Sequence, residues 1–210
     1  MSGDVTGTHF AWRPATRAGL PTLLLLHGTG GTEHDLLSLA ADLLPGAACL
    51  APRGAVLEHG MPLFFRRLAE GVFDQDDLLI RTEELADFIR GSATREGFDP
   101  ARVVAIGFSN GANIAASLLL RGRYPLQGAI LLRPMLPFEP PVPPDLPGTR
   151  VLISAGALDP MVTRPQVEAL QSALTRGGAE VTLAWQQAGH GLLAADVEVA
   201  RRWLAGVIAA

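Results

Sequence analysis

The sequence predicts an α/β fold with a mainly parallel central sheet flanked by helices, in a single domain spanning residues 1–210. Apolar segments of strand length alternate along the chain with longer segments of helical period. Several apolar segments contain almost no polar residue, which is typical of parallel strands covered on both faces. The chain is long enough for one sizeable core, with 48% hydrophobic and 18% charged residues.

The expected strands are spread along almost the whole chain. Their residue ranges are 9–13, 23–27, 47–51, 102–108, 128–132, 150–155 and 180–186. Helical patterns lie between and after them, at residues 35–44, 76–95, 110–121, 165–176 and 196–208. In the longest of these helices most apolar side chains fall on one face with charged side chains opposite, as in a helix packed on a sheet. Alternation of this kind indicates a parallel sheet with crossover helices.

A proline-rich segment follows the fifth expected strand, between residues 134 and 147. Proline lacks the backbone N–H and fixes φ, so this segment forms neither a regular helix nor a central strand. We expect a stiff loop over the carboxyl edge of the sheet, too short to hold a helical lid domain. Ligands of open α/β sheets bind outside the carboxyl ends of the strands, so a site is expected in the loops that start there.

Composition excludes several classes of function. The formal net charge of −4 gives no basis for nucleic acid binding. All 17 basic residues are arginines, which excludes Schiff-base chemistry and a lysine-dependent phosphate loop. Cys49 is the only cysteine, so an internal disulfide and a thiolate metal cluster are excluded. The N-terminal segment lacks the features of a secretory signal and no apolar run could span a bilayer, so we expect a cytoplasmic protein.

The segment GFSNG at residues 107–111 is the strongest candidate for a catalytic site. It matches G-x-S-x-G between an expected strand and an expected helix, where a strained turn lifts the serine hydroxyl above the sheet. Gly107 and Gly111 leave room for neighbouring backbones, and the helix N-terminus adds partial positive charge where an oxyanion would form. Ser109 is therefore the candidate nucleophile. The alternative is a tight strand-to-helix turn with a capping serine.

A serine nucleophile needs a base within hydrogen-bonding distance and a third group that orients the base. On a fold of this kind the chain order is serine, acid, histidine. His190 is the only histidine after Ser109, and it lies between two glycines on the loop after the last expected strand. Asp159 follows the strand at 150–155 and is the best candidate for the acid. The alternatives are a loop histidine without a role and an aspartate that only shapes a turn.

A glycine-rich turn, HGTGG at residues 27–31, follows the first central strand. Backbone N–H groups can converge in such a turn, so we expect the N–H of Thr29 or Gly30 and that of Asn110 to form an oxyanion hole. The rival interpretation is a dinucleotide or phosphate loop. It fails because the third glycine of G-x-G-x-x-G would fall on Glu33 and because a P-loop needs a lysine.

The remaining polar candidates indicate no metal and no cofactor. His9, His34 and His59 are scattered and lack the paired spacing of metal ligands. His27 ends a strand beside the glycines, and we expect it to bond the backbone of the turn. Asp196 opens the last expected helix, and we expect it to cap that helix.

Apolar side chains near the expected carboxyl edge are candidates for an acyl or aryl pocket. The candidate substrate-binding residues are Phe64, Phe65, Met135, Leu158 and Met161. For any single one, core or loop packing is an equally good explanation. No heptad or exposed apolar stripe identifies an interface, so a homodimer stays open.

Four motifs resemble the α/β-hydrolase fold: HGTGG after the first central strand, GFSNGA at the serine turn, a late LDP and a late AGHGL. More narrowly, they resemble the phospholipase/carboxylesterase family of small serine esterases without a lid domain, which includes acyl-protein thioesterases and bacterial carboxylesterases. The resemblance covers about residues 20–205. It implies Ser109 as nucleophile, His190 as base and Asp159 as orienting acid, with Thr29 and Asn110 as backbone oxyanion donors.

Departures from the thioesterase members bear on the substrate. Those members usually carry a leucine and an acid in the early turn and a glutamine after the serine, where this chain has Thr29, Gly31 and Asn110. Lipidated-protein substrates are therefore not implied. The resemblance implies hydrolysis of a small or medium acyl or aryl ester through an acyl-enzyme. The alternatives are a thioesterase or lysophospholipase acting on longer acyl chains, and a hydrolase-like binding module without activity.

Overall fold

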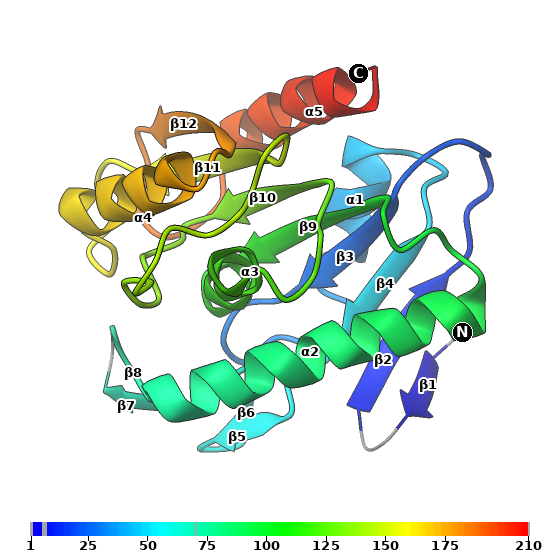
Figure 1. Cartoon of the computed structure of the whole chain (residues 1–210), viewed down its shortest axis with the longest axis horizontal. Helices are drawn as coiled ribbons and strands as arrows, with labels where there is room; N and C mark the ends of the chain where they lie inside the picture. The colour runs from blue at the N-terminus through cyan, green and yellow to red at the C-terminus, as the bar shows by residue number, and fades with distance from the viewer. Residues whose placement is uncertain (1, 6–7, 70, 210) are drawn as a thin grey trace.

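An eight-stranded sheet forms the centre of the computed structural model, which describes residues 2–5, 8–69 and 71–209 (Figure 1). The strand order is β1-β2-β4-β3-β9-β10-β11-β12. β1 and β2 pair antiparallel with their neighbours, and the strands from β4 to β12 run parallel. The strands are β1 (Ser2–Val5), β2 (Thr8–Arg13), β3 (Thr22–Leu26), β4 (Cys49–Pro52), β9 (Val103–Phe108), β10 (Gly128–Leu132), β11 (Arg150–Gly156) and β12 (Glu180–Gln186).

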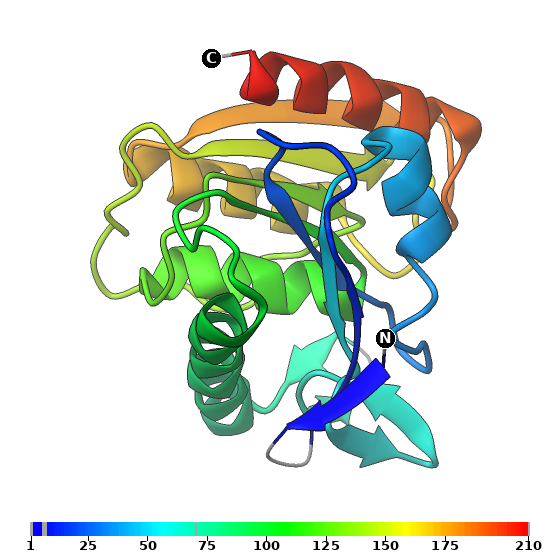
Figure 2. The same cartoon turned by 90° about the vertical axis from the view of Figure 1, so that its right-hand side faces the viewer.

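Five helices cover the two faces of this sheet within the described residues. α2 (Gln75–Glu96), α3 (Asn110–Arg121) and α4 (Arg164–Arg176) pack on one face, and α1 (Leu37–Leu43) and α5 (Ala194–Ile208) on the other. Figure 2 shows α5 above the sheet with α2 and α3 below it. The strands between the layers are apolar on both sides, which explains their continuous apolar sequence: Leu24 and Leu26 point into one core and Leu23 and Leu25 into the other.

The predicted α/β architecture is confirmed. Each of the seven expected strands and five expected helices is present, with ends that differ by two residues or fewer. β1 was not expected. The proline-rich segment contains no helix or strand, but only its start lies at the carboxyl edge. Near the end of the segment, the N–H of Leu146 donates to the carbonyl of Gly177, just after α4. The segment leaves the carboxyl edge because the chain must return to the opposite edge of the sheet before the parallel strand β11 can begin.

Two small hairpins between β4 and α2 were also not expected. They consist of β5 (Val56–Glu58) with β6 (Met61–Leu63) and β7 (Arg67–Ala69) with β8 (Val72–Phe73). Arg66 lies between the two hairpins, and its N–H donates a hydrogen bond to Asp77 Oδ2 in the first turn of α2. No helix in the described part of the chain is both long and apolar enough to cross a bilayer.

Candidate active site

Ser109 occupies a strained turn between β9 and α3. Its φ of 52° and ψ of −114° lie where L-residues are rarely found. Its N–H donates to the Leu132 carbonyl at the end of the next strand, at 2.9 Å. A side chain at Gly107 would come within 2.5 Å of the Gly111 carbonyl oxygen, and one at Gly111 would collide with the backbone of Leu26. Glycine at both positions therefore lets α3 start close against β3 and β9.

A continuous chain of hydrogen bonds connects Ser109 to an acid. Ser109 Oγ lies 2.8 Å from His190 Nε2, and His190 Nδ1 lies 2.8 Å from Asp159 Oδ2. The carboxylate cannot donate, so Nδ1 carries the ring proton toward Asp159 and Nε2 is left to accept from the serine hydroxyl. The Asp159 side chain is 1% exposed and that of His190 is 20% exposed. The structure thus brings together the three residues that sequence singled out from three different loops.

Asp159 has a second set of partners. Its Oδ1 accepts the N–H of Met161 at 2.8 Å and that of Val162 at 3.3 Å. The aspartate therefore shapes the turn after β11 and contacts His190 at the same time. The two explanations given by the sequence, a turn-forming residue and an orienting acid, are both compatible with this geometry.

His27 holds the glycine-rich turn, as expected. Its Nδ1–H donates to the Gly28 carbonyl at 2.7 Å, and its Nε2 accepts the N–H of Gly54 at 2.9 Å. Burial lowers the pKa of His27 below its ordinary value, and the bond to Gly28 opposes this only in part. A neutral ring is what the bond from Gly54 requires, because a protonated Nε2 cannot accept.

Two residues beside Ser109 have backbone N–H groups without a hydrogen-bond acceptor in the described chain. They are Thr29 and Asn110, which line the same small cavity as Ser109 and His190. The N–H of Gly30 donates to the Pro62 carbonyl at 2.8 Å, so of the two alternatives in the turn only Thr29 has a free donor.

The candidate pocket residues separate into two groups. Met135 and Met161 line the cavity at Ser109, whereas Phe64, Phe65 and Leu158 do not. Phe65 is fully buried and packs edge-on against Phe73, because it belongs to the core beneath α2. Leu158 is 69% exposed and points into solvent. A role of these three residues in substrate binding stays a prediction.

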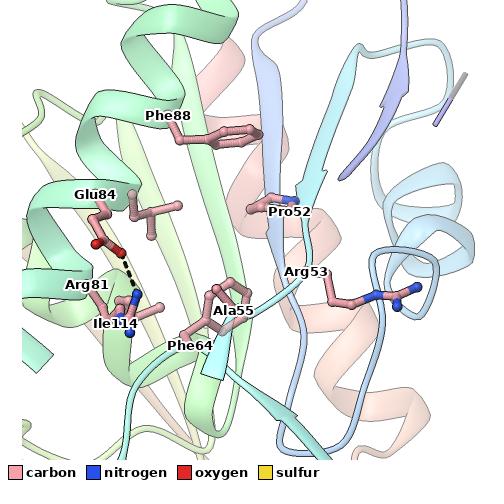
Figure 3. Close-up of a pocket in the computed structure, with 9 residues that line it drawn as sticks. Pro52, Arg53, Ala55, Phe64, Arg81, Glu84, Phe88 and Ile114 are labelled. Atoms are coloured by element: carbon pink, nitrogen blue, oxygen red, sulfur yellow. Dashed lines mark hydrogen bonds and ion pairs between the residues drawn. The ribbon is translucent and has the colours of Figure 1, made fainter. Parts of the chain in front are cut away.

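Phe64 lies near the site but lines a different cavity. Its N–H donates to Asn110 Oδ1 and its ring packs 4.7 Å from that of His27. On its far side is a second cavity of about 50 Å³, between β4 and α2 (Figure 3). The two arginines there are paired, Arg81 with Glu84 at 2.8 Å and Arg53 with Glu33. This cavity therefore offers no unmatched charge to an ionic ligand.

Sequence reasoning missed several residues that line the cavity at Ser109. They are Arg67, Gly71, Asn113, Arg133 and Val162. Arg133 could have been noticed, because it directly follows an expected strand at the carboxyl edge. Asn113 is one helical turn after Ser109, and its Oδ1 accepts the N–H of Met135 at 2.9 Å. Among the described residues no cluster of His, Cys, Asp or Glu has the arrangement of a metal site.

The fold is that of an α/β-hydrolase. The sequence profile of the family described as Phospholipase/Carboxylesterase matches residues 12–208, and the chain belongs to that family.

Known proteins resemble most of the chain. A Bacillus subtilis (strain 168) protein named "Putative hydrolase MhqD" is 52% identical over 181 residues, which cover 86% of this chain and 90% of that protein. The crystal structure of the Bacillus cereus carboxylesterase is 44% identical with a TM-score of 0.94, covering 96% of this chain and 95% of that one. A carboxylesterase from Mesorhizobium loti is 35% identical with a TM-score of 0.90, covering 98% and 99%.

Proposed function

We propose that this protein is a serine hydrolase that cleaves small carboxylic esters through an acyl-enzyme, with Ser109, His190 and Asp159 as a catalytic triad. The observation that carries the proposal is the unbroken chain of two 2.8 Å hydrogen bonds from Ser109 to Asp159. These contacts match those of a nucleophile, its base and the group that orients the base. Membership of the phospholipase/carboxylesterase family supports the same chemistry.

In the first step Ser109 Oγ bonds to the ester carbonyl carbon while its proton moves to His190 Nε2. Asp159 stabilises the imidazolium through the Nδ1–H bond. The free N–H groups of Thr29 and Asn110 would hold the tetrahedral oxyanion, and Asn110 opens α3, so the helix N-terminus adds partial positive charge. The carbon–oxygen bond to the alcohol then breaks, and the alcohol leaves with the proton from Nε2.

In the second step water attacks the acyl carbon and gives its proton to Nε2. The bond from the acyl carbon to Ser109 Oγ breaks, Oγ takes the proton back, and the acid leaves. Both steps need a neutral imidazole at the start, so hydrolysis should slow on acidification. A rate that does not fall on acidification would contradict this mechanism.

The size of the cavity favours short acyl groups. The enclosed space at Ser109 is small, about 30 Å³. Met135 and Met161 form its apolar wall, and thioethers adapt to flat or branched groups. A long acyl chain would have to lie outside this cavity. We therefore propose small or medium acyl and aryl esters, not long-chain thioesters or lysophospholipids.

The test is treatment with a fluorophosphonate, followed by intact-mass analysis and peptide mapping. We expect one adduct on Ser109 that is lost in Ser109→Ala and slowed in His190→Ala. Ser172→Ala is the matched control, because Ser172 is an exposed serine on α4 and should not affect labelling. A folded protein that takes up no adduct would indicate a binding module without activity.

Hydrolysis of a p-nitrophenyl ester series from acetate to palmitate tests the substrate class. The proposal predicts a maximum of kcat/KM at short chains. A maximum at the longest chains, or a preference for matched thioesters, would favour the thioesterase or lysophospholipase alternative.

A further inference from the structure

A buried arginine beside the proposed active site has no role in the mechanism above. Arg133 directly follows β10, and its side chain is fully buried. Its φ of 56° places the backbone in the left-handed region, which residues with a Cβ rarely adopt. Such a conformation persists where the surroundings fix it by several contacts, and it is found most often near functional sites.

The guanidinium of Arg133 donates hydrogen bonds to the loop that carries His190, at the residues before and after the histidine. Nε donates to the Gly189 carbonyl at 3.1 Å and Nη2 donates to the Gly191 carbonyl at 2.8 Å. These two glycines have no side chains to pack, so their carbonyl groups supply contacts through which the rest of the protein holds the loop. The arginine thus fixes the backbone immediately before and after the proposed base.

The same guanidinium is anchored in the core. Nη1 and Nη2 form a two-point ion pair with Asp196 at 2.8 and 2.9 Å, and Nη1 also donates to the Ser154 carbonyl at 3.2 Å. With the two carbonyls beside His190, these contacts occupy all five N–H donors of the arginine. The fork geometry explains why arginine serves here, since a lysine cannot make this set of bonds.

Asp196 is more than the helix cap that the sequence predicted. Its Oδ2 accepts the N–H of Leu193 at the start of α5, and its Oδ1 accepts the Ser154 hydroxyl at 2.6 Å. Burial by itself would raise the pKa of Asp196, but the bonds from Arg133, Ser154 and Leu193 outweigh it and lower the pKa. The carboxylate is therefore ionised, and β11 and α5 hold it in place.

The backbone around Arg133 also reaches the nucleophile. The carbonyl of Leu132 accepts the N–H of Ser109 at 2.9 Å, and the N–H of Met135 donates to Asn113 Oδ1 in α3. Residues 132–135 therefore bond to the serine turn and to the His190 loop, although Ser109 and His190 are 81 positions apart in the sequence.

We propose that Arg133 is a positioning residue that sets the distance between His190 Nε2 and Ser109 Oγ, with Asp196 as its anchor. The inference rests on the proposed function of Ser109 and His190. Without the arginine, the loop with its two glycines would sample positions in which the Nε2···Oγ bond is broken. A misplacement of about 1 Å can cost about 100-fold in rate.

The experiment compares Arg133→Lys, Arg133→Met and the double variant Arg133→Met/Asp196→Asn. Arg133→Met leaves a buried carboxylate unpaired and can fail to fold, whereas the double variant removes both charges and keeps a side-chain oxygen beside the Ser154 hydroxyl and the Leu193 N–H. We expect the double variant and Arg133→Lys to fold, with kcat for a short ester lowered by about 10- to 100-fold and KM within about twofold. Fluorophosphonate labelling of Ser109 should slow by the same factor.

Each variant is also made in the His190→Ala background. Because Arg133 acts through His190, substitutions of Arg133 in the His190→Ala protein should change its residual rate of hydrolysis by less than about twofold. Arg150→Met is the matched control, because Arg150 donates to the Gly206 carbonyl of α5 at the opposite end of that helix. Its kcat should be that of the wild type.

Two results would overturn the proposal, and both differ from a failure of the proposed function. One is a folded double variant that labels and hydrolyses at the wild-type rate. The other is an equal loss of rate in the wild-type and His190→Ala backgrounds, which would show a general structural effect. If the wild type itself takes up no fluorophosphonate, it is the proposed function that fails.

Discussion

Ser109 directly follows a buried parallel strand, whereas the hairpins between β4 and α2 contain strands of only two or three residues. Both regions border the same cavity. The strand that leads to Ser109 has five fully covered residues, but Leu57 and Leu68 in the hairpins are 70% and 71% exposed. The comparison shows that the proposed reacting groups follow long strands of the sheet, while part of the cavity wall lies on lightly packed hairpins. Changes in the first region should therefore affect kcat and folding, and changes in the second should affect KM.

The largest expected effect follows from removing the nucleophile. Ser109→Ala should lower kcat for a short ester by about 10⁴-fold or more, and His190→Ala should cost nearly as much. The double variant should lose little beyond either single one, since the two side chains act as a unit. Steady-state hydrolysis measures all three. A Ser109→Ala enzyme that keeps a tenth of its activity would place the nucleophile elsewhere.

The packing of the serine turn predicts the next largest effect. Gly111→Ala would push a methyl group into the backbone of Leu26 and should lower the free energy of unfolding by about 3 kcal/mol. Gly91→Ala is the matched control, because Gly91 is an exposed position of α2 with open space around it. That change should raise the free energy of unfolding by about 0.5–1 kcal/mol. Urea unfolding compares the two, and equal effects would contradict the close packing of α3 on β3.

The stability of the protein should depend on pH because of His27, which is buried in the glycine-rich turn. The pKa of His27 lies below its ordinary 6.5 in the folded state because of burial. As the pH falls below about 6.5, the unfolded chain takes up a proton that the folded protein does not, so stability decreases by up to about 1.4 kcal/mol per pH unit. His27→Gln should remove this part of the slope between the folded and unfolded pKa values. His34→Gln, an exposed control, should retain it.

The smallest expected effect concerns the hairpins. Arg67 lines the cavity and joins the hairpins through a two-point bond to Glu58. Arg67→Met should raise KM for a short ester by about fivefold, because a looser wall binds substrate less well in both ground and transition states. Its kcat should stay within about twofold. Arg66→Met is the control, since the Arg66 side chain is 61% exposed. A fall in kcat at unchanged KM would contradict the expectation that changes in the hairpins affect KM and not kcat.

The strands, the helices and the three hydrogen-bonded residues Ser109, His190 and Asp159 could be predicted from the sequence for one physical reason. Ser109, Asp159 and His190 each follow a strand of five or more residues whose pattern can be recognised. The hairpins could not be predicted, because two or three residues define no period. The apolar residues that line the cavity were hard to predict for a related reason: an apolar residue outside a regular element can face the core, a cavity or solvent.

Arg133 illustrates a different limit. An arginine after a strand is normally expected in solvent, and its burial depends on a carboxylate 63 positions later in the chain. Only the packing of α5 on the sheet brings Asp196 to it. Long-range ion pairs of this kind are not visible in local patterns, although they position the loops that the patterns identify.

The most direct test of the account is the second-order rate at which a fluorophosphonate acylates Ser109, measured against pH for the wild type and His190→Ala. We expect one adduct, a wild-type rate that falls on acidification, and a His190→Ala rate at least about 10³-fold lower without that pH dependence. Equal rates for the two proteins, or a wild-type rate independent of pH, would show that His190 does not activate Ser109.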